Sequence, residues 1–173
     1  MTEDHRCELL SEKKFATPEA PFHFTASGLS NVFLVGINYW VCPCGNPSAE
    51  IPAVKQLMMV IARSVVNKES ALNGDEIRFL RKRMGKKASD YAHEIRITPE
   101  YLSKLENGHL QAGEQTDELV RLVYVLQSKD EVLLAAFQSV TDRLARIWNR
   151  PHSPFKIIAK VTAADWNVLP AAA

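Results

Sequence analysis

Residues 77–108 read IRFLRKRMGKKASDYAHEIRITPEYLSKLENG, in which apolar residues at helical spacing alternate with turn signals. Thr98 can cap a helix, because its hydroxyl accepts a backbone N–H of the first turn, and Pro99 suits the first helical position. Asn107 and Gly108 tolerate the left-handed backbone that closes a helix. The sequence therefore predicts a short helix that is bounded on both sides.

A second short helix is predicted just upstream, from Lys87 or Ala88 to about Ile95. Tyr91, Ala92 and Ile95 are expected to face inward. A small residue such as Ala92 suits the contact between two helices that cross steeply over a short turn. The two helices together indicate a helix-turn-helix.

A third helix is predicted before this pair. Asp75 is expected to cap it, Ile77, Leu80 and Met84 to face inward, and Gly85 to end it.

Basic residues gather between Arg78 and Lys87, where the chain has six of them and no acidic residue. Such a cluster suits contacts with phosphate, although the net charge of the whole chain is only +1. In the downstream helix Leu102 and Leu105 form the apolar stripe, which leaves its polar residues on other faces.

The spacing of one set of residues resembles the phage repressor and Cro-like (XRE) helix-turn-helix family over about Asp75 to Leu126: Leu80-Arg81, Gly85, Ala92, Ser103 and Leu105-Glu106-Asn107-Gly108. The resemblance implies an all-α domain that binds double-stranded DNA. It also implies a buried ion pair between Arg81 and Glu106. The alternative is that both are solvated surface charges.

Family geometry would place the helix from Pro99 to Glu106 in the major groove. The resemblance implies base contacts from Pro99, Glu100 and Lys104, and contacts to the DNA backbone from Thr98, Tyr101, Ser103 and Asn107. Lys104 suits guanine and Glu100 suits cytosine, but Glu100 is equally explained as a residue that interacts favourably with the helix dipole. The family commonly opens its second helix with Ser/Thr-Gln. This chain has Lys87-Ala88 there, and Lys87 can contact a phosphate as a point charge.

The first part of the chain favours short antiparallel strands, since β-branched and aromatic residues between positions 22 and 41 are separated by Gly28, Asn31 and Gly36. A helix is expected after Ile51-Pro52, with an apolar face formed by Val54, Leu57, Met58, Ile61, Ala62 and Val65. Residues 67–74 are expected to form a polar hinge.

A narrower resemblance rests on an N-terminal cysteine, Ser27-Gly28-Leu29-Ser30-Asn31-Val32, Val35-Gly36-Ile37, Cys42-Pro43-Cys44-Gly45 and Ile51-Pro52. Together these resemble the MqsA-type antitoxin family, which joins a small zinc-binding domain to a Cro-like helix-turn-helix. Two Cys-x-x-Cys pairs hold zinc in that family. This chain has Leu10 where a partner of Cys7 is expected, and its second pair is shortened to Cys42-Pro43-Cys44.

Two interpretations of the altered cysteine pattern stay open. Cys7, Cys42, Cys44 and His5 can supply four zinc ligands, which would have to be fixed by folding around the ion. Alternatively, the region is a degenerate knuckle with free thiols, held by Tyr39, Trp40 and other aromatic residues of the sheet.

Two apolar stripes are expected downstream. Leu119, Leu122, Val123 and Leu126 form the first, and Val132, Leu133, Ala136, Val140, Leu144 and Ile147 form the second. The helix that carries the second stripe, with Trp148 near its end, is expected to pack against its copy in a homodimer. The alternative is that it is an extra core helix of a monomer. One short strand is expected from Phe155 to Val161, followed by a frayed Ala-rich end.

Several classes of protein are disfavoured by the sequence. No apolar run is long enough to span a bilayer and no charged-then-apolar leader is present, so we expect no membrane partner and a cytoplasmic location. The three cysteines argue against a disulfide framework. We find no catalytic constellation and no Gly-rich phosphate loop, and we expect no enzymatic activity.

The sequence thus predicts an α+β protein, in which a small antiparallel, zinc-ribbon-like domain (1–70) is joined by a helix to an all-α Cro-like domain (71–127), followed by a C-terminal helix and tail (128–173). The expected function is a DNA-binding transcriptional repressor. The alternative is an antitoxin whose N-terminal half neutralises a toxin protein and which autoregulates its operon.

Overall fold

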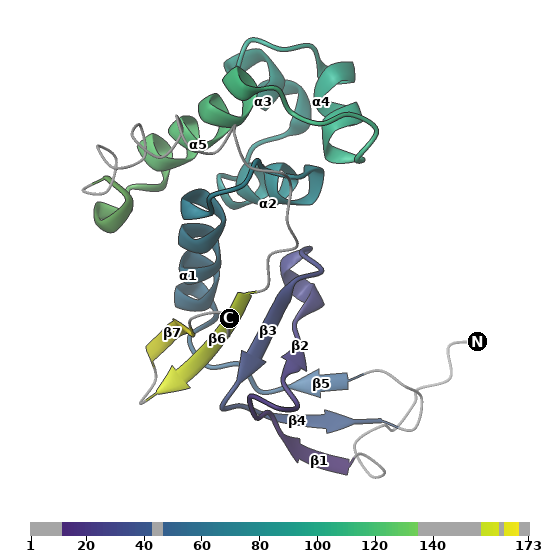
Figure 1. Ribbon diagram of the computed structural model, residues 1–173, viewed down its shortest axis with the longest axis vertical. Helices are drawn as coiled ribbons and strands as arrows, with labels where there is room; N and C mark the ends of the chain where they lie inside the picture. Colours follow the sequence, from purple (N-terminus) through teal and green to yellow (C-terminus); the bar gives the residue numbers. More distant parts are fainter. Residues whose placement is uncertain (1–11, 43–46, 135–156, 163–164, 170–173) are drawn as a thin grey trace. The chain divides into compact units, whose positions relative to one another are not determined.

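The computed structural model describes residues 12–42, 47–134, 157–162 and 165–169 (Figure 1). The protein is α+β and has an antiparallel sheet in its N-terminal part, as predicted. It divides into two compact units: unit 1 comprises residues 1–25, 30–61 and 156–173, and unit 2 comprises residues 26–29 and 62–155. The boundary falls inside one helix, and each unit is described by itself.

The elements follow one another along the chain. The strands are β1 Glu12–Phe15, β2 Phe22–His23, β3 Val32–Val35, β4 Asn38–Val41, β5 Pro47–Ala49, β6 Ile157–Thr162 and β7 Asp165–Leu169. The helices are the short 3-10 helix η2 Thr25–Ser27, α1 Val54–Asn67, α2 Gly74–Arg83, α3 Ala88–Glu94, α4 Pro99–Glu106 and α5 Glu114–Ser128.

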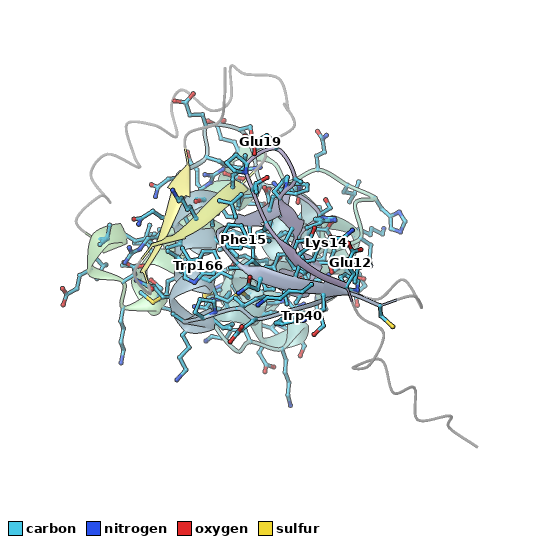
Figure 2. All side chains as sticks on the ribbon, turned by 90° about the horizontal axis from the view of Figure 1, so that it is seen from below. Glu12, Lys14, Phe15, Glu19, Trp40 and Trp166 are labelled. Carbon is cyan, nitrogen blue, oxygen red and sulfur yellow. The ribbon has the colours of Figure 1, made fainter. Side chains whose placement is uncertain are left out.

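Unit 1 contains two sheets. The first has three antiparallel strands in the order β1-β4-β5, and Figure 2 labels Phe15 and Trp40 on it. The ammonium of Lys13 lies 5.8 Å from the centroid of the Trp40 ring. The second sheet has four strands in the order β2-β3-β6-β7, in which β3 and β6 run parallel and the other pairs antiparallel.

The C-terminal strands belong to unit 1, whereas the sequence predicted a separate C-terminal segment with one short strand. In the parallel pair, Val32 lies opposite Ile157 and Leu34 lies opposite Ala159, and all four side chains are fully buried. The physical reason is that a buried strand such as β3 needs a hydrogen-bonding neighbour on each edge. Local pattern cannot identify a neighbour that is so distant in sequence.

Trp166 anchors β7 within unit 1. Its indole ring is buried, and its Nε1–H donates to the carbonyl of Pro52 at 2.8 Å, just before α1 begins. Pairing with β6 and this bond at Pro52 tie the end of the chain to its first sixty residues.

In unit 2, α2 begins differently from the prediction, because Asn73 caps it in place of Asp75. The Asn73 side chain accepts the Glu76 N–H at 2.9 Å, and the Glu76 carboxylate accepts the Asn73 N–H at 2.7 Å. This reciprocal pair satisfies two backbone donors at once, which Asp75 inside the first turn does not do. Met84 is only half-buried because it lies at the C-terminal cap rather than on the inward face.

Three helices of unit 2 end in the same backbone motif, with a left-handed residue just beyond the cap: Gly85 after α2, Arg96 after α3 and Gly108 after α4. For α4, Gly108 N–H donates to the Leu105 carbonyl and His109 N–H donates to the Lys104 carbonyl. The glycines relieve strain at φ values of 70° and 71°, whereas Arg96 adopts φ 59° with a side chain.

The inward face of α5 differs from the predicted stripe. The buried residues are Asp117, Val120, Arg121, Tyr124 and Val125, whereas the predicted residues are half-buried or, for Leu126, exposed. The apolar periodicity predicted a neighbouring face of α5, because the face that is actually buried carries an ion pair. Asp117 and Arg121 lie one turn apart, with Arg121 Nε 2.7 Å from Asp117 Oδ2, and both are essentially inaccessible.

The segment between α1 and α2, predicted as a polar hinge, is held in place by this pair. The Arg121 guanidinium donates to the carbonyls of Val66, Lys68 and Ser70 at 2.6, 3.0 and 2.8 Å. Asp117 accepts the N–H of Leu72 at 2.6 Å. The sequence predicted a hinge because the segment is polar. Its polar groups form hydrogen bonds with residues far along the chain, which the segment's own sequence does not reveal.

A second buried ion pair joins the start of the same segment to α2. Lys68 Nζ is 2.6 Å from Glu76 Oε2, and both side chains are buried. Desolvation lowers the pKa of Lys68, and the Glu76 carboxylate opposes that shift.

Part of the predicted C-terminal helix lies outside the described residues, including Ala136, Val140, Leu144, Ile147 and Trp148, as does the Ala-rich end. Within the described ranges, every helix is too short or too polar to cross a bilayer.

Candidate nucleic-acid interface

The helices α3 and α4 form a compact pair joined by a tight turn. Tyr91 and Ala92 of α3 and Leu102 and Leu105 of α4 are fully buried, together with Ile95 at the end of α3. These are the inward residues that the sequence predicted. Packing on this side leaves the opposite side of α4 facing outward.

Both ends of α4 lie where the sequence predicted them. Thr98 caps the helix, since its hydroxyl accepts the Tyr101 N–H at 3.1 Å, and Pro99 occupies the first turn. Asn107 is the C-terminal cap, followed by left-handed Gly108.

The outward side of α4 carries the polar residues predicted to contact DNA. Thr98, Glu100, Ser103, Lys104 and Asn107 are exposed, and Pro99 and Tyr101 are half-buried. Within the described part of the chain, the Lys104 ammonium and the Glu100 carboxylate make no hydrogen bond or ion pair. The Lys104 ammonium is therefore available to an external hydrogen-bond acceptor, and the Glu100 carboxylate to an external donor.

Lys87 lies at the other end of the pair, as the N-terminal cap of α3. Its backbone is extended, its side chain makes no capping hydrogen bond, and it is exposed. The neighbouring Lys86 differs, because its ammonium lies 3.3 Å from the carboxylate of Glu94.

The ion pair predicted between Arg81 and Glu106 is present, and it joins α2 to the last turn of α4. Arg81 Nε and Nη2 donate to the two carboxylate oxygens of Glu106 at 2.6 and 2.7 Å. Both residues are buried, so the alternative of solvated surface charges is wrong. The hydrogen bond to Glu106 raises the pKa of Arg81. Arg81 Nη1 also donates to the Lys86 carbonyl at 2.8 Å, just after α2 ends.

The sequence placed Arg78 in the basic cluster suited to phosphate and did not predict its contacts within the protein. Arg78 lies one turn before Arg81 in α2, and its guanidinium reaches the carbonyl of Glu106 and, at 2.8 Å, the side-chain oxygen of Asn107. The spacing of three residues from Arg81 was the available signal. The basic cluster is therefore smaller than its sequence suggests, since Arg78 and Arg81 are engaged within the protein.

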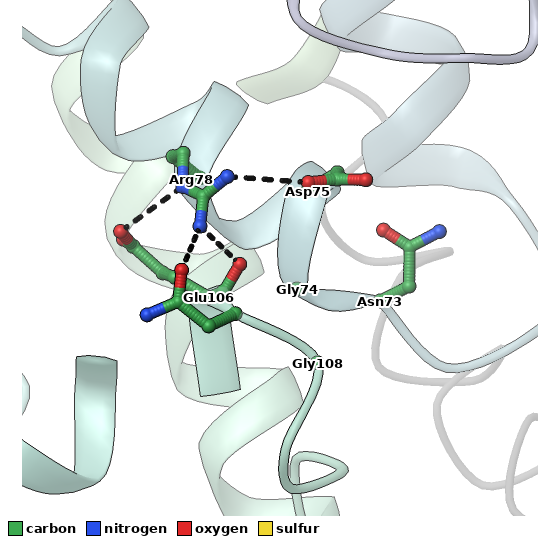
Figure 3. A pocket seen from close by; sticks show the side chains of 7 residues that line it. Asn73, Gly74, Asp75, Arg78, Glu106 and Gly108 are labelled. Atoms are coloured by element: carbon green, nitrogen blue, oxygen red, sulfur yellow. Dashed lines mark hydrogen bonds and ion pairs between the residues drawn. The ribbon is translucent and has the colours of Figure 1, made fainter. Parts of the chain in front are cut away.

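A pocket of about 360 Å³ lies where α2 begins and α4 ends, and Figure 3 shows Arg78 beside Asp75 and Glu106 within it. It is lined by Asn73, Gly74, Asp75, Arg78, Glu106, Asn107 and Gly108. A Cβ atom at Gly74 would lie 2.2 Å from the carbonyl oxygen of Leu105. The two helix ends thus approach closely only because residue 74 has no side chain.

We expect Gly74→Ala to lower the free energy of unfolding of unit 2 by ~1–3 kcal/mol, because the added methyl collides with helical backbone that cannot move freely. Chemical denaturation followed by far-ultraviolet circular dichroism measures this. Gly113→Ala is the control for a methyl added in open space, since a Cβ there meets nothing within 4 Å, and as the N-cap of α5 it should cost less than about 1 kcal/mol. Equal stability of the two variants would contradict the close approach.

Only one of the four predicted zinc ligands lies in the described residues. Cys42 is buried next to β4, while His5, Cys7 and Cys44 fall outside the described ranges. The residues described include no group of three or more His, Cys, Asp or Glu that could hold a metal ion. Zinc binding stays a prediction.

Comparison with known proteins gives no relative for this chain: no family model, no curated protein and no solved structure matches it.

Proposed function

We propose that the protein is a sequence-specific regulator that binds duplex DNA through the outward side of α4. In this proposal α3 and α4 act as a Cro-like helix-turn-helix, and α4 enters the major groove. The observation that carries the proposal is the exposed, uncommitted pair Lys104 and Glu100 on a helix whose two ends are fixed.

The chemistry of these two side chains matches base edges. A lysine ammonium donates to guanine O6 and N7, and a glutamate carboxylate accepts from cytosine N4. Reading bases requires the helix to hold its orientation, which the buried pair of Arg81 and Glu106 supports from behind. Lys87 supplies a positive charge for the DNA backbone.

The test is binding to two duplexes, one from directly upstream of the protein's own reading frame and one with the same bases scrambled, across a salt series. We expect a preference of ~10³-fold or more for the upstream duplex. Equal and steeply salt-dependent binding to both would contradict sequence-specific regulation and leave only phosphate attraction.

Lys104→Ala is expected to lose discrimination at one base position by ~1–3 kcal/mol. Affinities for duplexes with single base-pair changes measure this loss. The melting temperature should stay near that of the unmodified protein, because Lys104 is exposed. An equal loss on every duplex would show that Lys104 contacts phosphate instead of a base.

A further inference from the structure

Arg78 makes most of its contacts with the C-terminal end of α4. Its Nη2 group donates to the Glu106 carbonyl and to Asn107 Oδ1 at 2.8 Å, and its Nε lies 3.6 Å from Glu106 Oε2. On the other side, Nη1 lies 3.3 Å from the carboxylate of Asp75 (Figure 3). These contacts hold the guanidinium plane between the start of α2 and the end of α4.

This contact fixes the orientation of the Asn107 amide. A guanidinium has only donors, so the amide atom that faces Arg78 must be the oxygen. The amide nitrogen therefore faces away from Arg78, where it donates to Ser103 Oγ at 3.3 Å. Without Arg78, rotation by 180° would exchange the two ends of the amide at little cost.

With the amide in this orientation, Asn107 and Ser103 each have one hydrogen-bond donor left for a partner outside the protein. Asn107 Nδ2 has a second N–H, and the Ser103 hydroxyl, which accepts from Asn107, still has its own hydrogen to donate. Ser103 lies on α4 and Asn107 is its C-terminal cap, and both are exposed. A phosphate oxygen is an acceptor only, so this pair suits the DNA backbone.

We propose that Arg78 is a positioning residue that locks the Asn107 amide, so that Asn107 and Ser103 present donors to one backbone phosphate of bound DNA. The inference rests on the proposed DNA-binding function. It adds a residue on α2 that acts on DNA affinity through Asn107, and it assigns the phosphate contact to neutral groups instead of to the arginine charge.

Asn107→Asp is the first test, because aspartate keeps the oxygen that accepts from Arg78 but replaces the amide nitrogen with a second acceptor. We expect the melting temperature to hold or rise and the affinity to fall by ~10-fold or more, equally on the upstream and scrambled duplexes. Ala20→Glu is the control, since it adds one negative charge at an exposed position of unit 1 and should change affinity by less than about 3-fold. Unchanged affinity of Asn107→Asp would overturn the proposal.

Arg78→Lys and Arg78→Gln separate positioning from direct contact. Neither side chain can hold all the acceptors that Arg78 reaches, so both should weaken DNA binding by about 5-fold, with the same salt slope as the unmodified protein. If Arg78 itself touched phosphate, the lysine variant would bind nearly normally and the slope of the glutamine variant would fall by about 0.9. That result would overturn the proposal.

A double-mutant cycle excludes a purely structural role. In an Asn107→Ala background, the effect of Arg78→Lys on affinity should disappear, because no amide is left to orient. Additive losses, or a reduced fraction of active protein with unchanged affinity, would overturn the proposal. The unmodified protein is measured first, so failure to bind either duplex refutes DNA binding itself, whereas normal binding by the variants refutes only the role of Arg78.

Discussion

Replacing Arg121 by alanine is expected to lower the free energy of unfolding of unit 2 by ~3–5 kcal/mol. The guanidinium is buried and bonds to the Asp117 carboxylate, to one backbone carbonyl in the last turn of α1 and to two between α1 and α2. Its removal leaves a buried negative charge and several buried acceptors without donors. Either water enters to bond to them or they stay without donors, and both outcomes cost free energy.

Urea denaturation of Arg121→Ala, followed by the helical circular dichroism signal, measures the loss. Amide exchange should rise first in residues 66–72, because this segment loses the donors to its carbonyls. Arg96→Ala is the control, since Arg96 is exposed and its replacement should change stability by less than about 0.5 kcal/mol.

The double variant Asp117→Leu with Arg121→Met tests the electrostatic part of the argument. It removes both charges together, so it should be less destabilised than Arg121→Ala. It should not recover full stability, because the backbone carbonyls and the Leu72 N–H remain without partners. If Arg121→Ala is as stable as the unmodified protein, the pair of Asp117 and Arg121 does not hold the segment between α1 and α2 in place.

The second large effect is expected from ending the chain at residue 156, which removes β6 and β7. Unit 1 should lose its stable fold, because the truncation strips the β6 edge from β3 and exposes Val32 and Leu34. It also removes the buried side chains of Ile157 and Trp166. Burial of these two side chains is worth ~5 kcal/mol, which is comparable to the whole stability of a small domain.

Limited proteolysis with mass spectrometry measures this effect: cleavage sites should appear between residues 12 and 61, while the helices of unit 2 stay protected. Trp166→Phe is the milder companion: it keeps an aromatic ring but loses the hydrogen bond to Pro52 and part of the buried ring volume, at a cost of ~1–3 kcal/mol. An N-terminal region that resists protease after the truncation would contradict the role of β6.

The α3–α4 pair was predictable because its signals are local. Thr98, Pro99 and the Asn107-Gly108 ending act on neighbouring backbone groups, so their chemistry can be read within one turn of helix. The pair of Arg81 and Glu106 was predicted from a family resemblance, since spacing alone does not join residues on different helices.

The sequence by itself determined the positions of the helices α1 to α5 and the strand character of the first part of the chain, since these depend on contacts between near neighbours. Only the tertiary structure decided that β6 lies beside β3, that Asp117 and Arg121 turn inward, and that Arg78 holds Asn107. Each of these depends on partners brought together from distant parts of the chain. The pairing of a strand edge, the burial of a charge and the orientation of an amide each depend on the group that lies next to them. Composition and periodicity do not identify that group.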